Sequence, residues 1–316
     1  MASKNVAIVG SLNTDLVTYL NRVPSAGETV FGESFVTGFG GKGSNQAVMA
    51  RMCGAEVYMV GCLGDDAYGR ETRKHLEGLG VNIEYLQTAE TSSGVALIWV
   101  EPDGANRIVI VAGANARVDS DEVARALNSI RDLRVVVGQL EIPMDVTRQA
   151  FLTAKTLGAT TVLNPAPAHE LAKDFLSAVD WLVPNEHEFE SIFGQTPNTA
   201  SIVNAASHLF GSRTNESQGS SLSSFGLVVT LGKEGALVWS SADNKVTSVK
   251  TTTVNAVDTT GAGDAFVGAF AVALAEGREP ARAAAIGCRC ASDSVTRKGA
   301  QESFPSSEAT KRLLDL

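Results

Sequence analysis

Short, continuously apolar runs alternate with longer helical stretches along most of the chain. A run that is apolar without alternation is typical of a strand whose two faces are both covered. Six runs have this pattern: Val6–Gly10, Val57–Cys62, Val135–Gln139, Thr160–Asn164, Trp181–Pro184 and Leu227–Leu231. The helical stretches are Gly43–Cys53, Tyr68–Leu79, Asp121–Ile130, Met144–Leu157, Glu186–Phe193 and Ala200–Phe210. The alternation predicts an α/β fold with a mostly parallel central sheet and helices on both faces.

Two regions depart from this alternation. Leu16–Phe39 is strand-like but punctuated by Pro and Gly, and Gly94–Ala112 reads as a hairpin with its turn at 102–104. We expect one domain over residues 1–316, in which these regions, about 12–40 and 94–112, form a small β-sheet lid. The lid would cover a site or provide a dimer surface. Two ordinary edge hairpins are the alternative.

Composition narrows the function classes. Lys and Arg total 26 against 35 Asp and Glu, so the net charge is −9. This balance argues against a nucleic-acid or anionic-membrane surface, since either favours a basic face. No run reaches the roughly 18 apolar residues of a membrane helix. We expect a cytoplasmic protein, with an organellar address left open, and four reduced cysteines. The segment Gly211–Ser224 reads as a flexible surface insertion.

The Gly-rich segment Asp258–Phe266 is the most informative stretch for chemistry. It opens the apolar run Ala265–Ala275, which is too long and Ala-rich for a strand and is predicted to be a buried helix. Free amides and the positive end of the helix dipole meet at such a start, and glycines let a phosphate approach closely. Asp264 would then be a base inside an anion site, as transfer of a phosphoryl group to a hydroxyl requires. The alternative is an ordinary N-cap at Asp264.

Polar residues follow five of the predicted strands. These ends are Gly10–Asp15, Gln139–Glu141, Asn164-Pro165, Asn185–Glu188 and Thr230–Gly235. Each alone is an ordinary turn, but ligands of open α/β sheets bind beyond the carboxyl ends of strands, so the five together predict a site.

Two further turns contain groups that could bind a substrate or a cation. The turn Phe39–Gln46 lacks Walker A spacing, but Lys42 and Asn45 offer donors to a polyhydroxyl or phosphate. A helix-capping turn is the alternative. The turn Val295–Ala300 has backbone carbonyls that, with the Asp258 carboxylate, would suit a hard cation. The alternative there is a surface turn.

The segments Gly40–Gln46 and Asp258–Phe266 together resemble the signatures of the ribokinase-type carbohydrate kinase family. The likeness extends over nearly the whole chain, because Asn13–Asp15, Gln139–Glu141, Asn164–Pro167 and Val295–Gln301 occur in the expected order. The resemblance implies ATP-dependent phosphorylation of D-ribose at its 5-hydroxyl, with Mg²⁺, an activating K⁺ and a homodimer formed through the lid.

The resemblance also implies roles for individual residues. The sugar would be held by Asn13, Thr14, Asp15, Gly41, Lys42, Gly43, Ser44, Asn45 and Glu141. The base would be Asp264, and the anion hole would be Gly261, Ala262 and Gly263. Gly263 and Asp264 would also contact the nucleotide. ATP and its Mg²⁺ would be held by Asn185, Glu188, Thr230, Leu231, Gly232, Lys233, Glu234 and Gly235. The K⁺ site would be Asp258, Thr260, Ser294, Arg297, Gly299 and Ser303.

Other functions fit the pattern less well. A kinase of the same fold could act on another sugar or a nucleoside, but the predicted sugar set offers small polar groups and no evident aromatic slot. A sugar-binding regulator without catalysis would not need an intact Asp264 and Asp258. A dinucleotide-binding oxidoreductase is disfavoured because the first strand leads into Gly-Ser-Leu-Asn and not GxGxxG.

The chain departs from the family's pattern at Cys288, where the resemblance implies a polar residue near the adenine.

Overall fold

A nine-stranded sheet forms the centre of the computed structural model, which describes residues 4–216 and 225–315. Its order is β13-β12-β11-β10-β9-β8-β1-β4-β5, and every pairing from β11 to β5 is parallel. These strands are β1 (Asn5–Val9), β4 (Glu56–Gly64), β5 (Leu86–Ala89), β8 (Leu133–Gly138), β9 (Thr160–Leu163), β10 (Trp181–Leu182) and β11 (Gly226–Thr230). The last two strands in chain order, β12 (Ala236–Ser240) and β13 (Lys245–Val249), are added by antiparallel pairing. The mostly parallel sheet is therefore confirmed.

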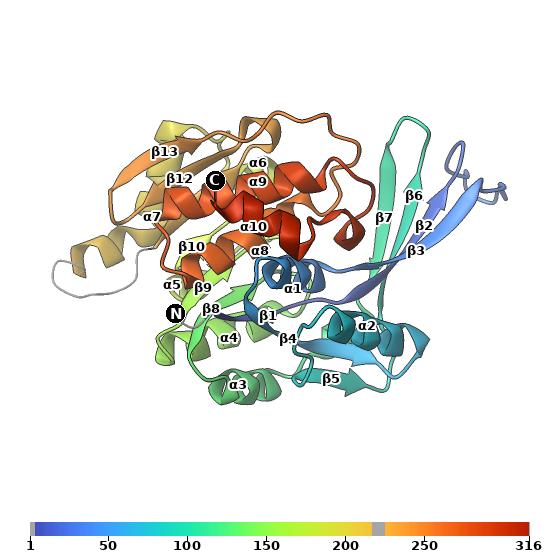
Figure 1. Ribbon diagram of the computed structural model, residues 1–316, viewed down its shortest axis with the longest axis horizontal. Helices are drawn as coiled ribbons and strands as arrows, with labels where there is room; N and C mark the ends of the chain where they lie inside the picture. Colours follow the sequence, from blue (N-terminus) through green and yellow to red (C-terminus); the bar gives the residue numbers. More distant parts are fainter. Residues whose placement is uncertain (1–3, 217–224, 316) are drawn as a thin grey trace.

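Helices cover both faces of this sheet, as Figure 1 shows. Successive residues of β1 supply the reason: Val6 and Ile8 join one buried cluster, while Ala7 and Val9 join the other. The first cluster includes residues of α1 (Lys42–Met52), α2 (Ala67–Gly78), α8 (Ala262–Ala275) and α9 (Pro280–Ser294), with α10 (Ser307–Asp315) packed against it. The second includes α3 (Ser120–Ser129), α4 (Met144–Thr156), α5 (Lys173–Ser177), α6 (Glu186–Phe193) and α7 (Thr199–Glu216).

A second sheet of four strands stands off the main one, at the right of Figure 1. Its order is β3-β2-β6-β7, with β2 (Asn13–Tyr19), β3 (Ser34–Gly40), β6 (Gly94–Val100) and β7 (Asn106–Val111). The β6–β7 hairpin turns where expected, and β2 pairs in parallel with β6. The two departures from the α/β alternation thus form one small sheet, which we call the lid.

Several local predictions need correction. The helices α5, α9 and α10 were not predicted. Helix α7 continues through Glu216, so the first half of the predicted insertion Gly211–Ser224 is helical, and residues 217–224 lie outside the described residues.

Two predictions from composition agree with the structure. Cys53, Cys62, Cys288 and Cys290 are all buried free thiols. Within residues 4–216 and 225–315, no helix combines the length and apolar character needed to cross a membrane.

Candidate active site

The five polar strand ends lie at one edge of the main sheet, because β1, β8, β9, β10 and β11 are parallel neighbours. A cavity of about 220 Å³ opens there. It is lined by Lys42, Asn164, Val183, Asn185, Glu188, Thr230, Thr259, Gly261, Gly263, Asp264 and Val267. The lining draws on the predicted sugar, nucleotide and catalytic sets, so the fold brings residues from all three to one place.

Helix α8 begins at the rim of this cavity. Gly261 is its N-cap, with φ of +74°, a backbone conformation that favours glycine. Asp264 is therefore the third residue of the helix, and its reading as an ordinary N-cap is wrong. Its carboxylate accepts hydrogen bonds from Asn45 Nδ2 and Gln46 Nε2, each at 2.9 Å. The Ala262 N–H donates a hydrogen bond to the Thr259 carbonyl. Gly263 has open space beside it, because a Cβ at this residue would meet nothing within 4 Å.

The turn before α1 is built by close approach of two backbones. Gly41 has φ of +89°, and a Cβ there would lie 2.7 Å from Asn13 N. A Cβ on Gly43 would lie 2.6 Å from Ser11 N. The glycines thus let α1 start against the end of β1, where the Ser44 N–H donates to the Ser11 carbonyl at 2.9 Å.

Carboxylates crowd around Lys42. Burial alone would lower the pKa of this ammonium group, but Asp264, Glu141 and Glu188 attract it and hold its pKa above the ordinary value. Glu141 Oε2 also accepts hydrogen bonds from Ser11 Oγ at 2.6 Å and from Lys42 N at 3.0 Å. Lys42 therefore stays charged at neutral pH and offsets the negative charge of the site.

Asp15 is the carboxyl group whose ionisation this site disfavours most clearly. Its pKa is raised from 3.8 to about 7, first by burial and then by repulsion from Glu302, Glu141 and Asp264. Asp15 comes from lid strand β2, and a Cβ on Gly40 of β3 would overlap its carboxylate. The lid therefore places an aspartate among the other acids of the sheet edge.

The remaining predicted sugar ligands also lie at this edge. Asn13 and Thr14 are buried at the start of β2, and Asn13 Oδ1 accepts a hydrogen bond from Asn115 Nδ2 at 2.8 Å. Ser44 is buried in the first turn of α1, where its hydroxyl donates to backbone carbonyls.

The predicted nucleotide segments start at the cavity and extend away from it. Asn185 and Glu188 form a capping box at the start of α6, which leaves the Glu188 carboxylate buried. Burial raises the Glu188 pKa, against the opposing effects of the Asn185 amide and Lys42. Thr230 lines the cavity, whereas Gly232–Glu234 form an exposed 3₁₀ turn beyond it.

The predicted cation residues gather behind the α8 start. Asp258 Oδ1 accepts hydrogen bonds from Thr260 N and Oγ1, and its Oδ2 accepts one from Gly299 N, so its pKa falls below the ordinary value despite burial. Arg297 donates to the Ser303 carbonyl at 2.6 and 2.9 Å and pairs with Asp293. Ser294 carbonyl accepts from Arg297 N. The set offers one carboxylate and several carbonyls or hydroxyls, which are the hard-oxygen ligands that such cations take. In this structure the Asp258 carboxylate and the Ser294 and Ser303 carbonyls already accept hydrogen bonds from protein groups.

Comparison with known proteins identifies the family. The model of the pfkB family of carbohydrate kinases matches residues 3–307. The chain belongs to this family. A ribokinase of Schizosaccharomyces pombe is 40% identical over 313 residues, which cover 96% of this chain and 95% of that protein. A deoxyribokinase of Salmonella typhi is 37% identical over 314 residues, which cover 99% of both. The Arabidopsis thaliana ribokinase complexed with ribose and ATP superposes with a TM-score of 0.85, at 30% identity and full coverage of both chains.

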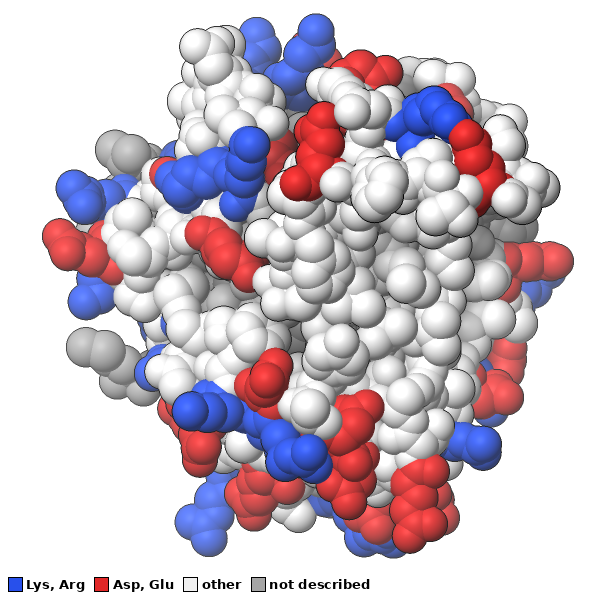
Figure 2. Space-filling view, turned by 90° about the vertical axis from the view of Figure 1, so that its right-hand side faces the viewer, with Lys and Arg blue, Asp and Glu red and all other residues white. Residues whose placement is uncertain are grey.

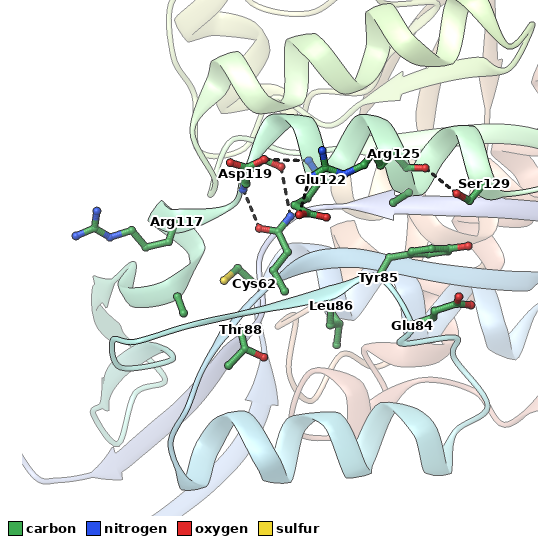
Figure 3. A pocket seen from close by; sticks show the side chains of 13 residues that line it. Cys62, Glu84, Tyr85, Leu86, Thr88, Arg117, Asp119, Glu122, Arg125 and Ser129 are labelled. Carbon is green, nitrogen blue, oxygen red and sulfur yellow. Dashed lines mark hydrogen bonds and ion pairs between the residues drawn. The ribbon is translucent and has the colours of Figure 1, made fainter.

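The pfkB kinase has a larger cavity, of about 590 Å³, elsewhere (Figure 3). It lies between edge strand β5 and helix α3, and its lining includes Tyr85, Arg117 and Arg125. Glu122 pairs with Arg125 there, and Gln87 is bonded to the Asp119 backbone. This cavity contains none of the Gly-rich turns or polar strand ends. The smaller cavity is therefore the active-site candidate in this carbohydrate kinase.

Sequence reasoning missed several residues of the site. Gln46 belongs to a recognised motif, yet its contact with Asp264 was not anticipated. Glu302 repels the Asp15 carboxylate and helps to raise its pKa. No local sequence pattern predicted that Glu302 would lie near the site. His75 was not among the predicted site residues, yet it is half-buried, with its ring stacked on Phe39.

Replacing Asp15 with Asn is expected to stabilise the ligand-free kinase above pH 7. Because the folded state keeps the Asp15 proton up to about pH 7 and the unfolded chain releases it near pH 4, the free energy of unfolding falls as pH rises through that window. Asp15→Asn removes this loss, a gain on the order of a few kcal/mol at pH 8 and little at pH 4. Urea unfolding at both pH values measures it, with exposed Asp243→Asn as the control. Equal stability of Asp15→Asn and the unchanged protein at pH 8 would contradict the assignment.

Proposed function

We propose that the protein transfers the γ-phosphoryl group of ATP to the 5-hydroxyl of D-ribose, with Asp264 as general base. The observation that carries the proposal is the position of Asp264 in the first turn of α8, in a cavity lined by both predicted sugar and nucleotide residues. The Schizosaccharomyces pombe ribokinase and the Arabidopsis thaliana ribokinase complexed with ribose and ATP support this choice of substrates.

Each part of the site has a role in this reaction. Asp264 accepts the proton of the sugar hydroxyl as it attacks phosphorus. The α8 N-terminal turn, Gly261–Gly263, stabilises the negative charge of the phosphoryl group in flight through its amides and helix dipole. Lys42 adds a fixed positive charge beside it. Phosphoryl transfer depends mainly on such positioning and charge stabilisation, and the lid would exclude competing water.

Sugar recognition is assigned to the polar residues at the β1 and β8 ends. Asp15, Lys42, Asn45 and Glu141 present charged and amide groups suited to hydroxyls, with Asn13 held in place by Asn115. The nucleotide is assigned to the segments that follow β10 and β11, which include Asn185 and Thr230.

Two cations complete the proposal. Mg²⁺ would be placed near Glu188, a buried carboxylate that lines the cavity, and would neutralise the phosphates of the nucleotide. K⁺ would be held by the oxygens of Asp258, Thr260, Ser294, Arg297, Gly299 and Ser303. It would fix the backbone behind the α8 turn and would not touch substrate.

A second candidate is a kinase for a related sugar. The Salmonella typhi deoxyribokinase is as well covered as the ribokinases and almost as similar in sequence. Ribose and deoxyribose differ at the 2-hydroxyl, so the choice between these two substrates depends on how the site treats that group. A coupled assay of ADP formation with ribose, deoxyribose, fructose and adenosine separates the alternatives. Greater kcat/KM for ribose than for the other three supports the proposal, and preference for another acceptor replaces it.

Asp264→Asn tests the general base. The amide keeps the size of the side chain but accepts the hydroxyl proton poorly, so kcat should fall by roughly 10²–10⁴-fold with little change in the KM for ribose. The coupled assay measures this, with Asp243→Asn as the matched surface control. Near-normal turnover of Asp264→Asn would remove Asp264 from its role.

Exchange of K⁺ for Na⁺ tests the proposed monovalent site. We expect kcat to decrease in Na⁺, because the smaller ion fits a carbonyl-rich set less well, and Asp258→Asn should reduce the difference between the two salts. Rates at constant ionic strength measure the effect. Equal rates in both salts would eliminate the K⁺ assignment while leaving Asp264 untouched.

We also propose that the lid forms a homodimer contact. Figure 2 faces the lid side and shows an uncharged centre bordered by charged residues. Seven large hydrophobic side chains are exposed on the lid strands or between them: Phe31, Phe35, Val36, Ile108, Val109, Ile110 and Val111. Such a concentration of apolar surface is unusual on a monomer, and a second copy of this chain presents the same surface.

Ile110→Lys is expected to shift the protein from dimer to monomer, because the introduced charge would have to be buried in the contact. Sedimentation velocity across protein concentrations measures the distribution. Val203→Lys provides the control, since Val203 is also exposed but lies on α7. A monomeric unchanged protein, or a dimer unaffected by Ile110→Lys, would refute the proposed contact.

A further inference from the structure

Two chains of side-chain hydrogen bonds converge on the Asp264 carboxylate. The first chain reaches Oδ1: Gln46 Nε2 donates to it at 2.9 Å, and Gln139 Nε2 donates to Gln46 Oε1 at 2.6 Å. The second reaches Oδ2 through Asn45 Nδ2 at 2.9 Å. Gln301 Nε2 then donates to Asn45 Oδ1 at 3.0 Å, and Gln301 Oε1 lies 2.9 Å from His75 Nε2. We call the second chain the Gln301 arm.

The direction of hydrogen-bond donation along the Gln301 arm follows from the Asp264 carboxylate at its end. An ionised carboxylate only accepts hydrogen bonds, so Asn45 must turn its amide NH₂ group toward Asp264. Its carbonyl oxygen then faces Gln301, which must donate. Gln301 in turn leaves its own carbonyl oxygen for His75, so His75 Nε2 carries a proton. Every link thus donates in one direction, from His75 to the carboxylate.

Burial keeps the arm in this arrangement. Asn45 and Gln301 are only 6% and 7% exposed. Rotating either amide would face like groups toward each other, and a buried polar group without a partner costs about 1–3 kcal/mol. Gln301 also donates to Ser44 Oγ at 3.1 Å, in the same first turn of α1.

The outer end of the arm is anchored on the lid. The His75 ring stacks on Phe39 of β3, with ring centroids 3.8 Å apart and planes inclined by 7°. His75 lies near the end of α2, whose first residue follows the N-cap Asp66. Asp66 accepts hydrogen bonds from Ser93 N and Oγ, directly before β6. Helix α2 is therefore tied to the inner ends of two lid strands.

We propose that His75 and Gln301 are positioning residues for the general base. They hold the Asp264 carboxylate in one rotation about its terminal bond, and they connect that rotation to the position of lid strand β3. The inference rests on the proposed function, in which Asp264 accepts the hydroxyl proton. A base must be aligned with that proton to act, and small displacements of reacting groups reduce rates strongly.

Gln301→Glu and Gln301→Met together test the arm. The carboxylate introduced by Gln301→Glu still accepts from His75, but it cannot donate to Asn45. It would draw the Asn45 NH₂ group toward itself and turn the Asn45 carbonyl toward Asp264. Gln301→Met has a similar size and removes the bond without reversing it. We expect kcat to fall by about tenfold or more in Gln301→Glu, and by less in Gln301→Met.

His75→Phe tests the outer link. A phenyl ring retains stacking on Phe39 but has no donor for Gln301, so kcat should fall while the melting temperature stays near that of the unchanged protein. Gln195→Glu makes the same chemical change as Gln301→Glu on an exposed side chain and is the control. Values of kcat, the KM for ATP and the melting temperature are recorded for every variant.

The outcomes separate three cases. A larger loss of kcat in Gln301→Glu than in Gln301→Met, without a matching rise in the KM for ATP, supports the arm. Gln301→Glu within twofold of the unchanged protein, or more active than Gln301→Met, overturns it in favour of a packing role. If Gln301→Glu does not fold, normal kcat in both Gln301→Met and His75→Phe overturns it. Asp264→Asn is measured alongside: an active Asp264→Asn protein refutes the proposed function itself, whereas an inactive one confines any failure to the arm.

Discussion

Negative charge collected at one edge of the sheet is the constraint on which the site depends. Glu141 and Asp264 repel Asp15, and Asp264 also repels Glu188. Lys42 is attracted by Asp264, Glu141 and Glu188. Like charges in a partly buried place repel strongly, so the ligand-free protein holds them at a cost in stability. The raised pKa of Asp15 reflects its burial first and this repulsion second. A site that binds hydroxyl donors and cations would relieve it, as expected where function opposes stability.

The same edge depends on how two helices begin. Helices α1 and α8 each start at a glycine with positive φ, and they pack along one another. The contact is close at Gly268, where a Cβ would lie 2.6 Å from the Gln46 carbonyl oxygen. This approach brings Asn45 and Gln46 of α1 within hydrogen-bond distance of Asp264. Two Gly-rich turns that are over 200 residues apart thereby form one structure around a single carboxylate.

Much of this arrangement could be predicted from the sequence, because its causes are local. Continuous apolar runs marked the central strands, and the Gly-rich turn marked the start of α8. Contacts between distant segments left no such signal: His75 and Gln301 are 226 positions apart and meet only after folding. Gly41 and Gly43 were expected to hold the sugar, yet here they allow close approach of the chain's own backbone. Helix α9 was missed although it is as amphipathic as α6, which was predicted.

Residues within the lid strands contact the residues of the candidate site. Strand β3 is exposed at Phe35 and Val36, stacks on His75 through Phe39, and presses Gly40 against Asp15. One strand of seven residues thus carries apolar surface at one end and contacts with the acidic site at the other. Because a paired strand transmits displacement along its length, any contact that holds the outer end also restrains the inner end. The proposed assembly through the lid and the proposed alignment of Asp264 would therefore both act through strand β3.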